Sequence, residues 1–489
     1  MRTITLLQCG VAIVAALSAA AAARAQSPLA DAAMQDDIKA VKSVLRQTSD
    51  VDAAQPDGMT ALHWAVHRNN VEVARMLLEA GATVSAGNRA GATPMYLATV
   101  NANAAMIELL LDAGEDPNAV LTPTLETVLM LTAKTGNPEA VQLLIERGAN
   151  VNAKQVREFT PLMFAAAEGH AAAVAGLLAA GADPNAATVA STKPERRPAG
   201  GMTAMLFAAR QGHLDAVRAL LAGGARVNQT SADLTSPLLI AVVNGHYDLA
   251  HELLQHGADP SLADAYGRAP LYAAIDLRNV QWSQAPAPRL PQARHMAMIE
   301  SLVAAGADLG TKIEAQVNHR GSFDMRWTEL VGGTAFLRAA WNGDIEVMNL
   351  LLEHGADPTV QTEKGETALL LLAGAGWPLG QGHIRSDEEI IAALDLLVDD
   401  YGMDVNATTS EGITPLMCAV FKGTNNVIEY LVERGARLDA VDNEGRSLLT
   451  WAGGVAANTG QPPRPQPESE KLIRRLMEEQ GVTVAMTTD

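Results

Sequence analysis

Residues 160–185 read TPLMFAAAEGHAAAVAGLLAAGADPN, one complete copy of a unit that recurs along the chain. Its most regular landmark is a glycine that follows an apolar stretch and precedes a small residue and then a polar one. This glycine recurs ten times, at positions 81, 114, 148, 181, 224, 257, 306, 355, 402 and 435. The spacings share a base period near 33 residues and rise to 43, 47 or 49 at four intervals. A fixed period of this length predicts a solenoid of stacked repeats.

Each part of the unit predicts a local structure. Twelve residues after the landmark glycine a threonine or serine is usual, and such a side chain caps the start of a helix. Proline often follows, as at Pro161, and it is favoured at the first helical position. The first helix ends at a Gly-His turn such as Gly169-His170, and a second helix runs to the next landmark glycine. That glycine can adopt the left-handed conformation that ends a helix. The expected capping residues are Thr93, Thr160, Ser236, Thr367, Thr414 and Ser447.

These motifs resemble the ankyrin repeat. Residues 60–65, TALHWA, and the run from Val73 to Gly81-Ala82 follow its T-P-L-H-x-A-A and L-L-x-x-G-A-D-x-N patterns. The resemblance extends from about Leu29 to Gly481. It implies an all-α solenoid of about twelve helix-turn-helix units, with projecting connector loops and a concave face of first helices and connector tips. It also implies protein binding rather than catalysis.

The spacing divides the chain into segments. We expect a degenerate N-terminal capping repeat over 26–57, one continuous ankyrin array over 58–445, and a C-terminal capping repeat over 446–489 with a proline-rich insertion. Insertions near 187–200 and 311–331 fall in the connectors. Those near 279–292 and 374–389 fall between the two helices of a unit.

The first residues have the three parts of a secretory signal peptide. Arg2 precedes an apolar run from Cys9 to Ala23, and an A-x-A sequence ends at Ala25. We expect cleavage after Ala25, and a location in the bacterial periplasm or outside the cell. The run is too short for a membrane span, and no later segment approaches eighteen consecutive apolar residues. Stable membrane insertion is therefore not expected.

The net charge of the chain narrows the classes of partner that it can bind. The formal net charge is −19, and loss of residues 1–25 removes Arg2 and Arg24 and no acid, which makes it −21. An acidic surface repels phosphate backbones, so nucleic acid is not an expected partner.

Once Cys9 leaves with the leader, Cys418 remains alone, so no intrachain disulfide can form. Stability must come from stacking, and we expect a monomer.

The resemblance also implies contact positions, which lie just after the alanine pair of each first helix. Trp341 and Phe421 would be exposed aromatic groups facing the groove, although neighbouring insertions could instead cover them. The candidates on the regular units are His67, Arg68, Lys134, Arg210, Gln211, Trp341, Asn342, Phe421 and Lys422.

The insertions add a second group of candidates. Trp327 is the preferred partner contact, with Phe323 and Arg326 in the same connector insertion. Tryptophan and arginine are frequent at binding hot spots, and loops on a rigid scaffold often carry recognition. Alternatively, Trp327, Trp282 and Trp377 anchor their own loops on the solenoid. A basic insertion with Lys193, Arg196 and Arg197 is either a site for an acidic partner or a solvated loop.

No motif predicts a catalytic, cofactor or metal site. His63 and His67 have metal-ligand spacing on one helix, but no third ligand accompanies them in the motif. There is no phosphate-binding glycine loop and no G-x-S-x-G sequence. Cys418 falls at an inward-facing helix position, unlike a nucleophile. The sequence therefore predicts no enzyme.

The favoured function is an exported, non-catalytic scaffold that binds a protein partner through its concave face and connector insertions. One alternative is an accessory or assembly factor for another periplasmic enzyme, for instance in redox or peroxide defence. Another is a metal-binding or enzymatic site built by the insertions, using His295, His319 or His383.

Overall fold

The computed structural model describes residues 27–191, 199–279, 290–315, 330–375, 385–454 and 465–482. Contacts group the chain into two compact units, unit 1 up to Gln229 and unit 2 from Thr230. The continuous array expected over 58–445 stays a prediction. A stack of repeats can be grouped into two units because a solenoid has no central core, and each repeat contacts only its neighbours.

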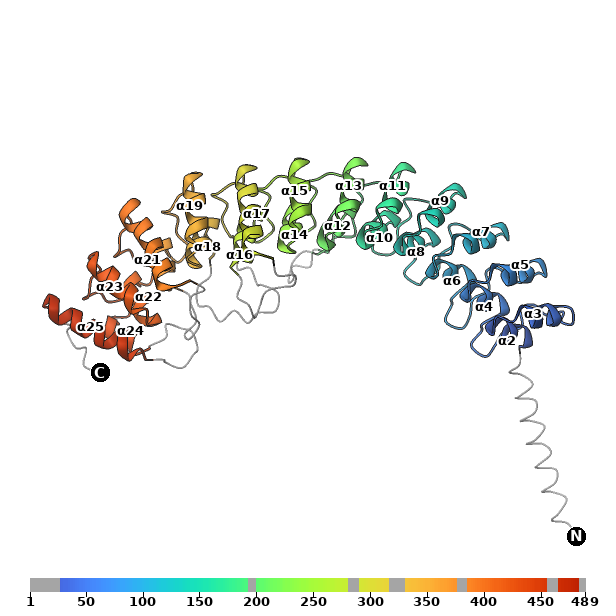
Figure 1. Ribbon diagram of the computed structural model, residues 1–489, viewed down its shortest axis with the longest axis horizontal. Coiled ribbons are helices and arrows are strands. Elements are labelled where there is room, and N and C mark those ends of the chain that lie inside the picture. Colours follow the sequence, from blue (N-terminus) through green and yellow to red (C-terminus); the bar gives the residue numbers. More distant parts are fainter. Residues whose placement is uncertain are drawn as a thin grey trace, which may run out of the picture. The chain divides into compact units, whose positions relative to one another are not determined.

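Unit 1 is built from helix pairs, in which the first helix packs against the second and against the first helix of the next pair (Figure 1). The pairs are α2 (Pro28–Met34) with α3 (Ile38–Leu45), α4 (Ala61–His67) with α5 (Val71–Glu79), α6 (Pro94–Val100) with α7 (Ala104–Asp112), α8 (Val128–Thr135) with α9 (Pro138–Glu146), α10 (Pro161–Glu168) with α11 (Ala171–Ala179), and α12 (Ala204–Gln211) with α13 (Leu214–Ala222).

Unit 2 repeats this plan with longer segments between some helices. Its pairs are α14 (Pro237–Val243) with α15 (Tyr247–Gln255), α16 (Pro270–Arg278) with α17 (Gln292–Ala304), α18 (Ala335–Trp341) with α19 (Ile345–Glu353), α20 (Ala368–Ala373) with α21 (Asp387–Asp395) and the π-helix η1 (Leu396–Asp400), α22 (Pro415–Lys422) with α23 (Asn425–Glu433), and α24 (Leu448–Ala452) with α25 (Pro467–Gln480).

The described ranges thus hold twelve helix pairs and no strand, only isolated bridges such as Ala187 with Thr203. This confirms the predicted all-α solenoid of helix-turn-helix units.

The predicted helix caps form at five of the six positions. The side-chain oxygen of Thr93, for example, accepts a 3.2 Å hydrogen bond from the backbone N–H of Tyr96. Thr160, Ser236, Thr367 and Thr414 do the same at their helices. Ser447 makes no cap bond, because its hydroxyl lies 3.3 Å from the hydroxyl of Thr450 instead.

The landmark glycines all have positive φ angles, from 64° at Gly402 to 96° at Gly114. Residues with a side chain rarely adopt this conformation, whereas glycine does so without a steric cost. The repeating glycine therefore ends each second helix as predicted.

The Gly-His turn joins consecutive repeats. His170 lies against Gly136 of the preceding repeat, and its Nε2 is 3.0 Å from the carbonyl oxygen of Lys134. His213 makes the equivalent contact, at 3.1 Å, with the carbonyl oxygen of Ala167. A Cβ atom at position 136 would lie 2.3 Å from the His170 ring. Glycine is therefore needed for close stacking as well as for its φ of 81°.

Backbone hydrogen bonds also link successive connectors. The N–H of Val156 donates to the carbonyl oxygen of Thr124 at 3.1 Å, and Val189 donates to Arg157 at the same distance. In unit 2, Ser410 donates to Lys364 at 2.8 Å. These bonds satisfy polar backbone groups and hold neighbouring connector tips in register.

Candidate protein-interaction surface

One face of each first helix in unit 1 stays accessible. At α4 it consists of Trp64, His67 and the C-cap residue Arg68, three positions that share a helix face. The remaining residues of α4 are buried. We call the equivalent positions of α4, α6, α8, α10 and α12 the first-helix stripe of unit 1. Its members are Trp64, His67, Arg68, Leu97, Val100, Asn101, Leu131, Lys134, Thr135, Phe164, Ala167, Glu168, Phe207, Arg210 and Gln211.

The leading position of the stripe carries a large apolar residue in every one of these helices. Trp64, Leu97, Leu131 and Phe164 are partly exposed, whereas Phe207 is 6% exposed. These residues come from consecutive repeats, so they form an apolar row across the helices. Such a row that remains accessible in a folded protein favours an interaction surface.

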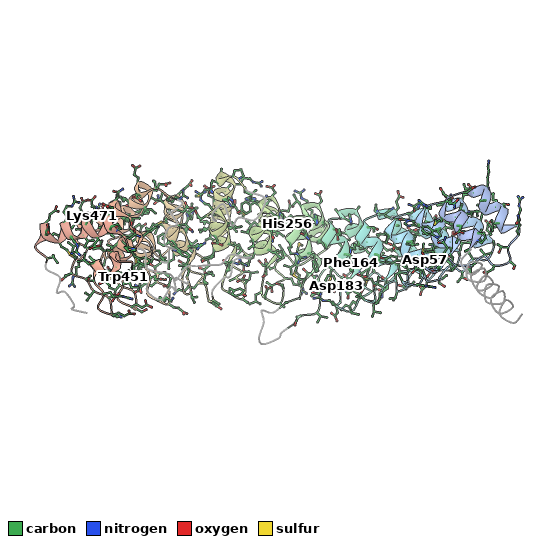
Figure 2. All side chains as sticks on the ribbon, turned by 90° about the horizontal axis from the view of Figure 1, so that it is seen from below. Asp57, Phe164, Asp183, His256, Trp451 and Lys471 are labelled. Atoms are coloured by element: carbon green, nitrogen blue, oxygen red, sulfur yellow. The ribbon has the colours of Figure 1, made fainter. Side chains whose placement is uncertain are left out.

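An aromatic cluster lies at the α10–α12 end of the row. The ring of Phe159, in the connector before α10, is centred 5.7 Å from that of Phe164 and 5.2 Å from that of Phe207. The guanidinium carbon of Arg210 lies 5.3 Å from the centre of the Phe207 ring, a cation–π arrangement. Phe164 is labelled in Figure 2. The partly exposed rings of Phe159 and Phe164 thus provide an apolar surface near a positive charge.

Five of the candidates predicted from sequence lie on this stripe. His67, Arg68, Lys134 and Gln211 are exposed, and Arg210 is partly exposed. The structure thus brings them together on one face, beside an apolar row that the sequence analysis did not single out. The signal was present in the variable position of the T-P-L-H-x-A-A motif, which is apolar in all five repeats.

The equivalent positions in unit 2 are largely closed. Trp341 is 4% exposed, and its indole Nε1–H donates a 3.0 Å hydrogen bond to the carbonyl oxygen of Ala375. Arg338 stacks over the Trp341 ring, 4.8 Å from its centre, and forms a buried ion pair with Asp276. These contacts use the same helix positions that are accessible in unit 1.

The prediction of exposed groove aromatics at Trp341 and Phe421 is therefore wrong. Phe421 is 4% exposed and packs edge-on against Trp451, with ring centres 5.6 Å apart. Asn342 is also buried, and its side-chain amide donates to the carbonyl oxygen of Arg338 at 2.9 Å. The described contacts that cover these two aromatics come from neighbouring repeats, whereas cover by the insertions, most of which lie outside the described residues, stays a prediction. Their burial follows from packing between repeats.

Lys422 is a candidate whose charged end is not accessible. Its side chain is partly exposed, but its Nζ is buried. Burial lowers the pKa of this lysine to about 6, against the opposing influence of the Asp387 carboxylate. A neutral amine in this position is unsuited to attracting an acidic partner at pH 7. Nearby Cys418 is buried, as predicted, and burial raises the pKa of its thiol.

A buried charged cluster in unit 2 was missed by the sequence analysis. The Asp344 side chain is fully buried and accepts hydrogen bonds from Arg278 Nε at 2.8 Å and Asn279 Nδ2 at 3.0 Å. Arg385 also approaches it, with 3.2 Å between Nη2 and Oδ1. Burial acts to lower the pKa of Arg278, but its pairing with Asp344 and Glu346 raises that pKa overall. Asp344 thus joins residues from three successive repeats.

A sequence signal for this cluster existed. Gly343-Asp344 stands where regular repeats have Gly-His, so a buried acid replaces the histidine that contacts the preceding repeat. Arg278 and Arg385 adjoin the two insertions between helices, just before 280–289 and just after 376–384. The cluster therefore anchors the repeat ends next to these insertions.

The histidines with described contacts have structural partners. His63 Nε2 lies 3.0 Å from the carbonyl oxygen of Ala92, and burial lowers its pKa. His295 Nδ1 lies 2.6 Å from the hydroxyl of Tyr247, and burial, followed by the charge of Arg278, lowers the pKa of His295. Among the described residues, no group of three or more His, Cys, Asp or Glu side chains is placed to hold a metal ion.

Several predicted features lie outside the described residues. They are the leader with its cleavage site at Ala25, the insertion candidates Phe323, Arg326 and Trp327, the tryptophans Trp282 and Trp377, the basic residues Lys193, Arg196 and Arg197, and the histidines His319 and His383.

Comparison with known families identifies the repeats. The model for ankyrin repeats in three copies matches residues 29–121, 116–188, 191–264 and 383–455, and the single ankyrin repeat model matches 332–363. This chain belongs to the ankyrin repeat family. Ankyrin repeats are typical of non-catalytic interaction modules, so membership indicates a protein-binding scaffold.

Known ankyrin proteins match parts of the chain. Human neurogenic locus notch homolog protein 1 is 32% identical over 166 residues, which is 32% of this chain and 6% of that protein. Alpha-latrocrustotoxin-Lt1a of Latrodectus tredecimguttatus is 24% identical over 232 residues, or 46% of this chain and 14% of the toxin. The chain thus spans only a small part of these relatives. The crystal structure of the human ASB11 ankyrin repeat domain has 27% sequence identity and a TM-score of 0.42, covering 48% of this chain and 100% of that one.

In the described ranges of this ankyrin protein, every helix is too short or too polar to cross a membrane.

Proposed function

We propose that this ankyrin protein is an exported, non-catalytic scaffold that binds a protein partner through the first-helix stripe of unit 1. The observation that carries the proposal is the contrast between equivalent positions. Trp64, Leu131 and Phe164 form an accessible apolar row in unit 1. Arg338 and Cys418, at the equivalent positions of α18 and α22, are buried in unit 2.

The stripe has the composition of a binding surface. Aromatic and arginine side chains are frequent hot spots, and the stripe carries Trp64, Phe164 and Arg210 on rigid helices. Because the row crosses consecutive repeats, a single partner segment can contact several helices at once. A stacked array provides such an extended surface without a catalytic pocket.

Site-specific photocrosslinking in the native cells tests the surface. A benzophenone amino acid at position 131 should give one discrete covalent adduct with a partner protein. The same amino acid at Gln142, an exposed position on the second helix α9, is the matched control. No adduct from position 131, or equal adducts from both positions, would count against this surface.

Export is a separate part of the proposal, supported by the Arg2, apolar-run and A-x-A pattern of the first 25 residues. The mature protein should be recovered outside the cytoplasm with Gln26 at its N-terminus, as N-terminal sequencing would show. Recovery of intact protein in the cytoplasmic fraction alone would refute export.

A further inference from the structure

The charge of the first-helix stripe is opposite to that of the whole chain. Its fifteen positions hold three basic residues, Arg68, Lys134 and Arg210, and one acidic residue, Glu168. The full chain has a net charge of −19. Positive charge is therefore gathered on a surface that would be acidic if charges were distributed at random. Opposite charges across an interface promote encounter and set specificity.

The three basic side chains follow the repeat. Lys134 and Arg210 lie at equivalent positions of α8 and α12, and Arg68 lies one position further on, as the C-cap residue of α4; α4, α8 and α12 are alternate first helices. The helices between them, α6 and α10, have no basic residue at the two corresponding positions, where Val100 with Asn101 and Ala167 with Glu168 lie instead. The stripe thus alternates repeats that have a positive charge with repeats that have none, beside an unbroken apolar row.

Local contacts keep two of these charges in place. The Nε of Arg68 donates a 3.0 Å hydrogen bond to the carbonyl oxygen of Met34, and Arg210 stacks on Phe207. Lys134 is exposed at the end of α8. A side chain that is already ordered loses less conformational entropy when it pairs with a partner. The arrangement is suited to recognition.

We propose that the first-helix stripe of unit 1 binds an extended protein segment that carries apolar side chains and regularly spaced acidic side chains. This inference rests on the function proposed above and specifies the chemistry of the partner. Packed helices lie about 10 Å apart, so alternate first helices are separated by about 20 Å. An extended chain rises about 3.3 Å per residue, so acidic residues about six positions apart would face successive basic residues.

This spacing also orients the partner's side chains. Residues separated by an even number lie on the same face of an extended chain. Acidic residues six apart and apolar residues at the even positions between them would therefore all face the stripe. The apolar residues would cover Leu97, Leu131 and Phe164, while the acids pair with the basic side chains.

The apolar row favours a protein segment over a nucleic acid or a lipid surface. Nucleic acid binding depends on dense positive charge that neutralises many phosphates. Three basic residues on a chain of net charge −19 do not supply it. Partner side chains that combine apolar and acidic groups match both features of the stripe.

Labelled fifteen-residue peptides and the full-length protein provide the test, by fluorescence anisotropy. The first peptide has glutamate at its second, eighth and fourteenth positions, leucine at its fourth, sixth, tenth and twelfth, and serine or glutamine elsewhere. The second replaces the glutamates with lysine, and the third replaces the leucines with serine. The first should bind about tenfold more tightly than either of the others, and the difference from the second should fall at high salt.

Two protein variants with the same net charge test whether the preference for the glutamate peptide depends on the basic residues of the stripe. The triple variant Arg68→Gln, Lys134→Gln and Arg210→Gln should bind the glutamate and lysine peptides equally. The control variant Arg46→Gln, Arg75→Gln and Arg218→Gln removes three exposed basic residues beside or on the second helices, and should keep the preference. Circular dichroism establishes that both variants are folded.

The outcomes separate this inference from the function proposed above. If the lysine peptide binds as tightly and Leu131→Ser abolishes both interactions, the stripe binds protein but the acidic preference is wrong. Absence of peptide binding also overturns the inference, while the crosslink from position 131 tests protein binding independently. Oligodeoxythymidylate and phosphatidylglycerol vesicles are two further probes. If either binds more tightly than the glutamate peptide, and the triple stripe variant loses that binding, the surface belongs to an anionic polymer or a membrane instead.

Discussion

The indole Nε1–H of Trp341 donates a 3.0 Å hydrogen bond to the carbonyl oxygen of Ala375, 34 residues further along the chain. This bond joins α18 to the residues just after α20 and closes the first-helix face of unit 2 at that repeat. His67 occupies the equivalent position of α4 in unit 1 and is exposed. One position of the repeat therefore has two roles, stacking in unit 2 and accessible surface in unit 1.

Substitutions at Trp341 should act on stability. Trp341→Phe removes the hydrogen bond to Ala375 and should lower the free energy of unfolding by about 1 kcal/mol. Trp341→Ala also leaves a cavity and should lower it by about 4 kcal/mol. Urea unfolding followed by circular dichroism measures both. An alanine variant with parental stability would show that the indole is not packed between repeats.

The Asp344 cluster should contribute more than a surface ion pair. Asp344→Asn removes the negative charge beside buried Arg278 and partly buried Arg385, and should destabilise the chain by about 3 kcal/mol. Asp439→Asn is the control, because Asp439 pairs with Arg437 at the exposed surface. That variant should have nearly parental stability in the same urea experiment. Equal losses in the two variants would contradict a special role for the buried carboxylate.

Lys422 should make stability depend on pH. Its pKa of about 6 in the folded chain lies below the value of about 10.4 for an unfolded lysine. Between these two values the unfolded chain binds the extra proton, so the lysine's contribution to the free energy of unfolding increases with pH. Lys422→Met removes this contribution. It should stabilise the chain at pH 7, and the gain should shrink towards pH 10.

Guanidinium unfolding of parent and Lys422→Met at pH 7, 8.5 and 10 measures this difference directly. Comparing the two chains at each pH cancels the titration of other groups. A difference that stays constant or widens with rising pH would show that the Lys422 amine is charged in the folded state.

The glycine of the inter-helix turn should be less replaceable than the landmark glycine. Gly148→Ala places a Cβ in open space at a φ of 88°, and should cost about 1 kcal/mol from backbone strain alone. Gly136→Ala has similar strain and also displaces His170 from the Lys134 carbonyl, so its cost should be about 2 kcal/mol. Urea denaturation of both variants gives the comparison.

A double variant isolates the histidine contact. If the Cβ at position 136 destabilises by displacing His170, Gly136→Ala should cost less in a His170→Ala background than in the parent. Identical costs in the two backgrounds would place the whole effect in the backbone.

Local features of the repeat were predictable because each depends on a few neighbouring residues. Thr160 caps its helix through the N–H of Met163, three residues away, and Gly181 ends the next helix through its own φ of 87°. The family resemblance supplied the contact positions His67, Arg68, Lys134 and Arg210. It also pointed to Trp341 and Phe421, which are buried. A motif specifies a position in the repeat, but it does not specify what lies over that position.

The sequence by itself determined the repeat, its helix pairs and their caps, since these follow from a period of about 33 residues and from the chemistry of threonine, proline and glycine at fixed places. Only the tertiary structure decided which first helices remain accessible. Burial depends on side chains from different repeats, such as Trp341 with Ala375 or Phe421 with Trp451, meeting in space. Leu131 and Phe164 remain partly exposed, and this difference assigns the candidate interaction surface to unit 1.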